Sequence, residues 1–225
     1  MKSLIIIPTL NERDNLIALI PEIFRHVPDA EILIADDHSQ DGTKELARER
    51  VTVLDRITDR GYGKAVLDGF RWALKHEFKR IITMDADFSH DPAILPALIS
   101  QLSTSDVAIG SRYIRGGEIQ NWSLHRRMLS RVANWYVRAV LGTRIQDNTT
   151  GYMGYRRGVI EGLLVYPPLA EGYAFLVEVK YRIKNFRIAE LPIVYAERRE
   201  GKSKMSWKII WESVWVPWKL RFGRK

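Results

Sequence analysis

The sequence predicts an α/β fold in which helices flank a mostly parallel sheet. In the first half of the chain, short runs of apolar and β-branched residues alternate with segments of helical periodicity, a pattern typical of βαβ units. The runs are continuously apolar, as expected of strands that are covered on both faces. Strands are expected at residues 4–7, 31–35, 51–54, 81–84 and 107–109.

The helices follow from the spacing of apolar residues. A helix should begin near Gly63, because Val66, Phe70 and Ala73 then share one face. A second helix, expected at 122–141, has a basic face and an apolar face on opposite sides of the helical wheel. The basic set is Arg127, Arg131 and Arg138, and the apolar set is Leu129, Val132, Tyr136 and Val140.

The C-terminal segment 203–225 is rich in tryptophan. Trp207, Trp211, Trp215 and Trp218 fall within about 80° on a helical wheel, and Pro217 is expected to kink or end this helix. Basic residues follow the stripe, a composition typical of a helix that lies in a membrane interface. Packing of the stripe on the rest of the chain, or stacking on nucleic acid, is the alternative.

Composition and charge narrow the class of protein. With 225 residues, 46% of them hydrophobic and 28% charged, the chain is expected to form a single domain spanning 1–225, and disorder is excluded. The absence of cysteine excludes a disulfide scaffold, a thiolate metal site and a cysteine nucleophile. The net charge of +8 is uneven, since 115–144 carries +5, 197–225 carries +6 and the remaining 166 residues carry −3. The two basic segments predict phosphate-rich partners.

No segment has the pattern of a membrane span or a signal peptide. The longest stretch without charged residues, 92–105, has 14 residues and two prolines, whereas a span needs roughly 20 apolar residues. We therefore expect a protein that is made and kept in the cytosol.

Acidic residues follow two of the predicted strands, at the edge where parallel sheets bind their ligands. Asp85 and Asp87 follow the fourth strand, and Asp36 and Asp37 follow the second. Two carboxylates at such an edge can hold a hard divalent cation that keeps positions open for substrate phosphates. The alternative for Asp85 and Asp87 is a turn with a helix cap before Pro92.

Three further motifs each allow two interpretations. Thr9 and Glu12 match a capping box, which is compatible with a helix N-terminus that receives an anion or a base edge. Gly61 and Gly63 stand at a helix entrance where the backbone can approach a ligand closely, but the rest of the dinucleotide fingerprint is absent and a Rossmann dehydrogenase is disfavoured. The basic loop 198–204 is either a solvated turn or a clamp on phosphate oxygens.

Taken in order along the chain, these motifs resemble the dolichol-phosphate (polyprenyl-phosphate) mannose synthases of glycosyltransferase family 2, which have a GT-A fold. The resemblance extends over nearly the whole chain, and several of its motifs are specific to this branch of sugar transferases. The matching strings are PTLNERDNL (8–16), ADDHSQDGT (35–43), GYGKA (61–65), MDADFSHDP (84–92), GSRY (110–113), RRMLSRVAN (126–134), DNTTGY (147–152), GYAFLVE (172–178) and REGKSKMS (199–206).

The resemblance implies roles for individual residues. Contacts to the nucleotide sugar are implied for Pro8, Thr9, Glu12, Asp36, Asp37, Gly63, Lys64, Asp85, Ala86, Asp87 and Arg198. A divalent metal, Mg²⁺ or Mn²⁺, is implied at Asp85, Asp87 and Ser89. The acceptor phosphate and the membrane are implied at Arg112, Arg126, Arg127, Ser130, Arg131, Ser203 and Lys204. Catalytic roles are implied for Asp87, Arg198 and Lys204.

The implied reaction is transfer of mannose from GDP-mannose to a polyisoprenyl phosphate, with inversion, by an enzyme bound peripherally to the cytosolic face of a membrane. A phosphate monoester has a second pKa of about 6, so the nucleophile is already ionised at pH 7 and no strong general base is needed. A membrane-anchoring protein is compatible with the family as a further partner, whereas nucleic acid is not expected. Two alternatives remain: another donor and acceptor, such as UDP-glucose and undecaprenyl phosphate, and a non-enzymatic α/β module that binds membranes or nucleic acid.

Three positions depart from the family's usual residues. Leu10 stands in place of Tyr or Phe, Tyr62 in place of Leu, and Met153 in place of Arg. The change at Leu10 leaves recognition of the base open. The C-terminal span of some members is missing, which implies a soluble or peripherally bound form.

Overall fold

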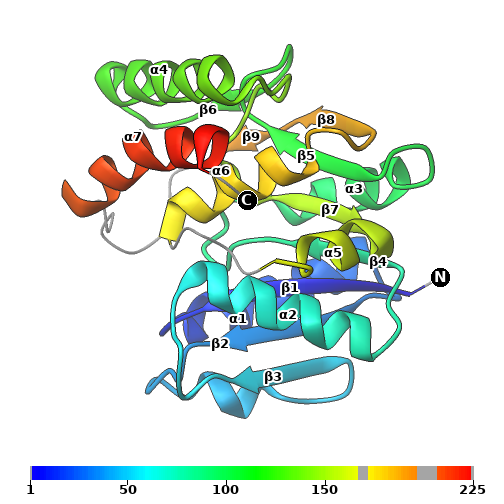
Figure 1. The fold of residues 1–225 in the computed structure, drawn as a ribbon. Helices are drawn as coiled ribbons and strands as arrows, with labels where there is room; N and C mark the ends of the chain where they lie inside the picture. The colour runs from blue at the N-terminus through cyan, green and yellow to red at the C-terminus, as the bar shows by residue number, and fades with distance from the viewer. Residues whose placement is uncertain (1, 167–171, 197–206, 224–225) are drawn as a thin grey trace.

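The computed structural model describes residues 2–166, 172–196 and 207–223. Its centre is a seven-stranded sheet in the order β3-β2-β1-β4-β7-β5-β8, and β6 and β9 form a two-stranded ribbon beside it (Figure 1). The strands are β1 Ser3–Thr9, β2 Glu31–Asp36, β3 Val51–Asp55, β4 Arg80–Thr83, β5 Val107–Ser111, β6 Glu118–Ile119, β7 Met153–Arg156, β8 Ile188–Pro192 and β9 Val194–Tyr195. The helices are α1 Arg13–His26, α2 Tyr62–Lys75, α3 Leu95–Gln101, α4 Leu124–Leu141, α5 Arg157–Leu163, α6 Gly172–Ile183 and α7 Trp207–Phe222, with short 3₁₀ turns η1 Thr43–Leu46 and η2 Pro92–Ile94.

The predicted α/β class with a mostly parallel sheet is confirmed. β1 pairs in parallel with β2 and β4, β2 with β3, and β5 with β8. The exception is β7, which is antiparallel to both of its neighbours, β4 and β5. Strands form at all five predicted places, whereas β7 and β8 were not expected from the sequence.

Helices cover both faces of the sheet. α2, α5 and α6 lie on the face toward the viewer in Figure 1 and bury Leu4 and Ile6 of β1. α1 and α3 cover the opposite face and bury Ile5 and Ile7. Successive residues of β1 therefore enter two different cores, which explains the unbroken apolar run in the sequence. Gly69 brings α2 close to the sheet, because a Cβ there would lie 2.7 Å from Cγ2 of Ile6.

α4 and α7 form a further layer on the outer side of α6 (Figure 1). In this layer, Val137, Val140 and Leu141 of α4 pack on Val177 of α6. α4 begins at Leu124, two residues later than predicted, and ends at Gly142, whose φ of +65° suits a left-handed C-terminal cap.

The prediction that Pro217 could end the C-terminal helix is wrong, because α7 runs on to Phe222. Val216 and Pro217 are buried, whereas Trp215 and Trp218 are 63% and 46% exposed. The side chains of Trp207 and Trp211 lie outside the described part of the chain. None of the helices in the described ranges is long and apolar enough to cross a bilayer.

Candidate active site

The carboxyl ends of β1, β2 and β4 bring the first predicted site residues to one edge of the sheet. Thr9 pairs with Asp36, and the next N–H, that of Asp37, donates to Thr9 O at 2.9 Å. The neighbouring residue Pro8 belongs to β1, and Ala86, after β4, is buried. Residues that are predicted to contact the nucleotide sugar, and that lie far apart in the sequence, therefore meet at this edge.

Asp37 is held in a buried network of opposite charges. Arg56 donates to Oδ1 of Asp37, and the N–H of Gly61 donates to Oδ2 at 2.7 Å. Arg56 also donates to Asp68 Oδ2 at 2.8 Å. Two carboxylates around one buried guanidinium fix the Asp37 side chain at the start of α2. These bonds hold the end of β2 against the beginning of α2.

The Asp36 side chain is engaged within its own loop. It is fully buried, and its two carboxylate oxygens accept hydrogen bonds from the hydroxyl and the N–H of Ser39. Ser39 Oγ accepts in turn from the N–H of Asn11 at 2.7 Å. Asp36 therefore shapes the loop around the predicted nucleotide site and ties it to the loop after β1.

The predicted capping box is absent. Thr9 is the last residue of β1, and Glu12 itself occupies the position before α1, where its Oε2 accepts from Asn15 Nδ2 at 2.6 Å. The first N–H of α1, that of Arg13, is capped by Asp41 Oδ2 at 2.9 Å. Thr9 Oγ1 is buried and makes no hydrogen bond within the described ranges. A bound ligand or water would satisfy this hydroxyl.

The helix cap that the alternative placed before Pro92 is present. The N-terminal cap of η2 is Asp91, whose Oδ1 accepts from the N–H of Ala93 at 2.9 Å. The Asp85 side chain remains 27% exposed. Neither carboxylate of the D-A-D motif serves as this cap.

The oxygen atoms of Asp87 and Ser89 are suited to binding a divalent metal ion. Asp87 is 5% exposed and accepts the N–H of Ser89 at 3.1 Å, while the Ser89 hydroxyl is buried with no hydrogen-bond partner among the described residues. Two carboxylates and an unsatisfied hydroxyl are hard oxygen donors that suit Mg²⁺ or Mn²⁺. No group of three or more His, Asp or Glu side chains in the described ranges could hold such an ion alone. Substrate phosphates and water would have to complete its coordination.

His90 supports the D-A-D loop, a role that the sequence analysis missed. Its Nδ1 accepts a hydrogen bond from the N–H of Asp85 at 2.9 Å. Its ring stacks on the ring of Tyr152, with the two ring centres 4.7 Å apart. Burial lowers the pKa of His90, which favours the neutral ring that this bond requires. The only signal was its place in the MDADFSHDP string, because the partners of the ring are distant in sequence.

Gly63 allows two helices to pack closely. A Cβ at Gly63 would lie 2.8 Å from the ring of Phe175, so the glycine allows α2 to cross α6 closely. The ammonium of Lys64 pairs with Asp59 Oδ1 at 2.5 Å. The contacts to the nucleotide sugar that the resemblance implies for Gly63 and Lys64 stay predictions.

A second cluster lies at the end of β5, centred on the buried pair Arg112 and Asp147. Nε and Nη2 of Arg112 donate to the two oxygens of Asp147 at 2.7 and 2.8 Å, and Nη2 also donates to Thr149 Oγ1 at 2.7 Å. Burial alone would raise the pKa of Asp147, but the charge and hydrogen bonds of Arg112 hold it below its ordinary value. The pair is ionised, and the guanidinium is held in one orientation.

Lys180 extends this cluster into the core. It is fully buried on α6, and its ammonium donates to Thr150 O at 2.6 Å. Burial lowers the pKa of Lys180 to about 7. Glu190 of β8 closes the cluster by accepting the N–H groups of Gln146 and Asp147 at 2.8 and 3.1 Å. Sequence reasoning assigned no role to Asp147 or Lys180, although both lie in or next to matched strings.

The other described residues that are predicted to contact the acceptor phosphate or the membrane lie on α4, and their surroundings differ. Ser130 Oγ accepts from the hydroxyl of Tyr113 at 2.6 Å, and the guanidinium of Arg126 lies 3.9 Å from the centre of the Trp122 ring. Arg127 is partly buried, whereas Arg131 is exposed. Arg198, Ser203 and Lys204 lie outside the described residues.

Comparison with known proteins gives the family. Residues 4–164 match the family model described as glycosyl transferase family 2. The chain is 40% identical to a polyprenol monophosphomannose synthase of Mycolicibacterium smegmatis, over 98% of this chain and 88% of that protein. It is 39% identical to an undecaprenyl-phosphate mannosyltransferase of Micrococcus luteus, over 95% of this chain and 91% of that protein. It is 36% identical to a dolichol-phosphate mannosyltransferase of Pyrococcus furiosus, over 94% of this chain but 61% of that protein.

The fold is shared with solved sugar transferases. The glucosyl-3-phosphoglycerate synthase of Mycobacterium tuberculosis, solved with Mn²⁺, UDP and phosphoglyceric acid, superposes with a TM-score of 0.73 at 18% identity, covering 100% of this chain and 79% of that one. A structure of the same enzyme with Mg²⁺ and UDP gives a TM-score of 0.69. The family model, the relatives and the fold agree with the acidic edge of the sheet: this chain has a GT-A fold and belongs to glycosyltransferase family 2.

Proposed function

We propose that the chain transfers mannose from GDP-mannose to the phosphate of a polyisoprenyl phosphate, with inversion at the anomeric carbon. The observation that carries this proposal is its identity of 40% and 39%, over nearly its full length, with enzymes named for making mannosylated lipid phosphates. The site supports it, because one edge of the sheet gathers acidic groups while Arg112 and α4 gather cations. A nucleotide sugar and an anionic acceptor need such opposite surroundings.

The donor is proposed to bind at the acidic edge. Asp85, Asp87 and Ser89 would hold Mg²⁺ or Mn²⁺, which are the ions found with UDP in the structural relative. When bound, such an ion neutralises the charge that develops on the leaving diphosphate. Asp37 and Thr9 are proposed to contact the nucleoside, and His90 keeps the loop that carries Asp85 in place.

The acceptor phosphate is proposed to bind between Arg112, Arg126 and Ser130. The bonds to Asp147 and Thr149 occupy Nε and Nη2 of Arg112, so its Nη1 is the donor left for a phosphate oxygen. Because the acceptor is already ionised near pH 7, the task of these residues is to position it in line with the donor and to neutralise charge. Arg198, Ser203 and Lys204 are proposed to contribute from the loop outside the described residues.

A peripheral position on the cytosolic face of a membrane is proposed for the α4 and α7 layer. Large apolar side chains of both helices are exposed, namely Leu124, Met128, Leu129, Val132 and Trp135 of α4 and Val214, Trp215, Trp218 and Phe222 of α7. Contiguous exposed apolar surface beside cations is typical of a helix at a lipid surface. A polyisoprenyl acceptor is itself held in a membrane, so this layer would bring the site to its substrate.

The decisive experiment incubates the purified chain with separate nucleotide sugars and a polyprenyl phosphate in vesicles, with Mg²⁺ or Mn²⁺, and identifies the product by mass. A hexosyl-phosphate lipid formed from GDP-mannose supports the proposal. Product from UDP-glucose alone would establish the alternative donor, and no product from any donor would favour a non-enzymatic module. Turnover by the chain alone would also show that no membrane-anchoring protein is required.

A further inference from the structure

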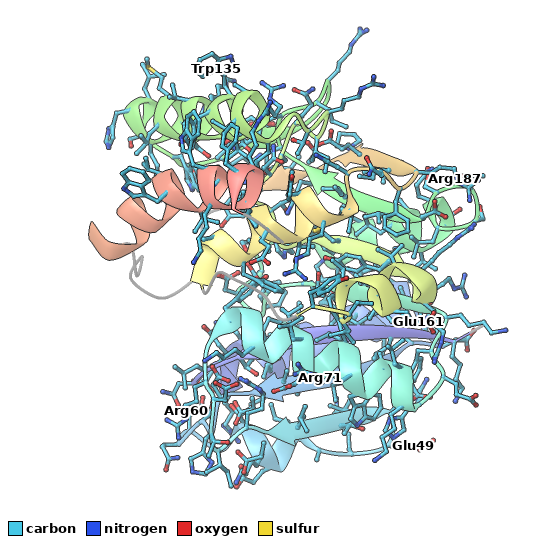
Figure 2. The ribbon with its side chains drawn as sticks, viewed as in Figure 1. Glu49, Arg60, Arg71, Trp135, Glu161 and Arg187 are labelled. Carbon is cyan, nitrogen blue, oxygen red and sulfur yellow. The ribbon has the colours of Figure 1, made fainter. Side chains whose placement is uncertain are left out.

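One flank of α4 carries a cavity beside the proposed acceptor residues Arg112, Arg126 and Ser130. It has a volume of about 390 Å³, and its walls include Arg131, Val132, Trp135 and Arg138 of α4 together with Tyr113 and Gln146. In Figure 2, Trp135 lies on the outer side of α4, away from the sheet. Because the Tyr113 hydroxyl bonds Ser130, the cavity adjoins the proposed acceptor site without including Arg112.

The polar part of this cavity is cationic. Arg131 and Arg138 are two helical turns apart and therefore lie on one side of α4, and no acidic side chain is among the residues that line the cavity. Arg138 donates from Nη1 to Oε1 of Gln146. Its Nε is buried and makes no hydrogen bond within the described ranges. Arg131 and Arg138 therefore give the cavity two cationic side chains.

The remaining wall of the cavity is apolar and open. Val132 and Trp135 are 58% and 63% exposed. They continue into Leu124 and Met128, which lie on the same side of α4 at helical spacing and are 73% and 57% exposed. A ligand that fits both walls has an anionic head and an apolar tail. A free phosphate would use only the arginines.

We propose that this cavity binds the phosphodiester headgroup of an anionic membrane phospholipid between Arg131 and Arg138, with the acyl chain over Val132 and Trp135. The inference rests on the proposed function in one respect, since it takes this side of α4 to face a bilayer. Such a lipid would fix how α4 sits on the membrane and would hold Ser130, one residue from Arg131, at the depth of the acceptor phosphate.

The test measures binding of the full chain to vesicles by co-sedimentation, without nucleotide sugar or polyprenyl phosphate. Phosphatidylcholine vesicles with and without phosphatidylglycerol are compared for the wild type, Arg138→Gln and Arg144→Gln. Arg144 is exposed, follows α4 and does not line the cavity, so Arg144→Gln removes the same charge from the same region. We expect a loss of about fivefold for Arg144→Gln and of about tenfold or more for Arg138→Gln, only on vesicles with phosphatidylglycerol.

Equal losses for the two variants would overturn the proposal, because they would indicate only general attraction to a charged surface. A loss for Arg138→Gln that is equal on neutral vesicles would also overturn it. A separate arm adds polyprenyl phosphate to the neutral vesicles. A loss for Arg138→Gln on these vesicles alone would also overturn the proposal, because the cavity would then belong to the acceptor. Thermal melting checks the fold, and Arg131→Gln, at an exposed position, repeats the test if Arg138→Gln melts early. Since no nucleotide sugar is present in any arm, the result does not depend on transferase activity.

Discussion

Helices α2 and α4 are both amphipathic in sequence, yet their apolar faces have different surroundings in the structure. The apolar face of α2 is covered by the sheet and by α6, and Val66, Phe70 and Ala73 are buried. The apolar side chains in the first half of α4 are exposed, and burial begins only at Asn134. Periodicity therefore shows that a helix has an apolar face, but it does not show whether protein or lipid covers it. The same contrast separates the acidic edge of the sheet, where the Asp37–Arg56 ion pair is buried, from the exposed apolar side chains of α4 and α7.

The largest expected effect concerns the donor end. Asp87→Ala should lower transfer by about three orders of magnitude or more, because the variant loses an oxygen donor for the proposed metal. The measurement is initial rate at saturating Mg²⁺ or Mn²⁺, with circular dichroism as the check on folding. Asp14→Ala, which removes an exposed carboxylate from the first turn of α1, is the matched control. Near wild-type turnover by a folded Asp87→Ala would remove this residue from the mechanism.

The next effect distinguishes the two helices by stability. Phe70 is fully buried and packs edge to face on Tyr155 with ring centres 5.2 Å apart, so Phe70→Ala should lower the free energy of unfolding by about 3–5 kcal/mol. Met128→Ala on the exposed side of α4 should change it by less than about 0.5 kcal/mol. Urea unfolding followed by circular dichroism measures both. Similar losses for the two variants would mean that the first half of α4 is covered in solution.

Membrane binding, unlike stability, should depend on the exposed apolar side chains of α4. Leu124→Ser with Met128→Ser should weaken binding to vesicles by about tenfold or more, because exposed apolar side chains lose the favourable transfer into lipid. Neither residue lines the cavity between Arg131 and Arg138, so the loss should be present on neutral vesicles as well. Co-sedimentation gives the binding constant. If the double variant binds as tightly as the wild type, the exposed face of α4 does not contact lipid.

A further prediction concerns the pH dependence of stability at Lys180. Its pKa of about 7 in the fold lies below the ordinary value of 10.5, so between these values the unfolded chain binds one more proton than the folded chain. The free energy of unfolding of the wild type should therefore rise with pH by about 1.4 kcal/mol per unit from about pH 7 upward, relative to Lys180→Met. Below pH 7 the two should be parallel. Urea unfolding at several pH values checks this, and parallel curves above pH 7 would mean that Lys180 stays charged in the fold.

The fold class and the acidic edge were accessible from local sequence. The five predicted strands are continuous apolar runs, and parallel strands deliver their carboxyl ends to one edge, which is why Asp37, Asp85 and Asp87 could be grouped. β7 was missed because its four residues, Met153–Arg156, contain no long apolar run and pair antiparallel to strands distant in sequence. The capping box failed for a related reason, since β1 extends to Thr9 and the cap of α1 comes from Asp41 in another loop.

Taken alone, the sequence determined the α/β class, the position of the acidic residues after their strands, the presence of two basic segments and the resemblance to a family, because each depends on neighbouring residues or on a matched string. Only the tertiary structure decided which partner each group has. It paired Arg112 with Asp147, buried Lys180 beneath Thr150, turned Gly63 toward Phe175 and left Leu124 and Met128 exposed. Burial and ion pairing are properties of groups brought together from distant segments, and no local pattern encodes them.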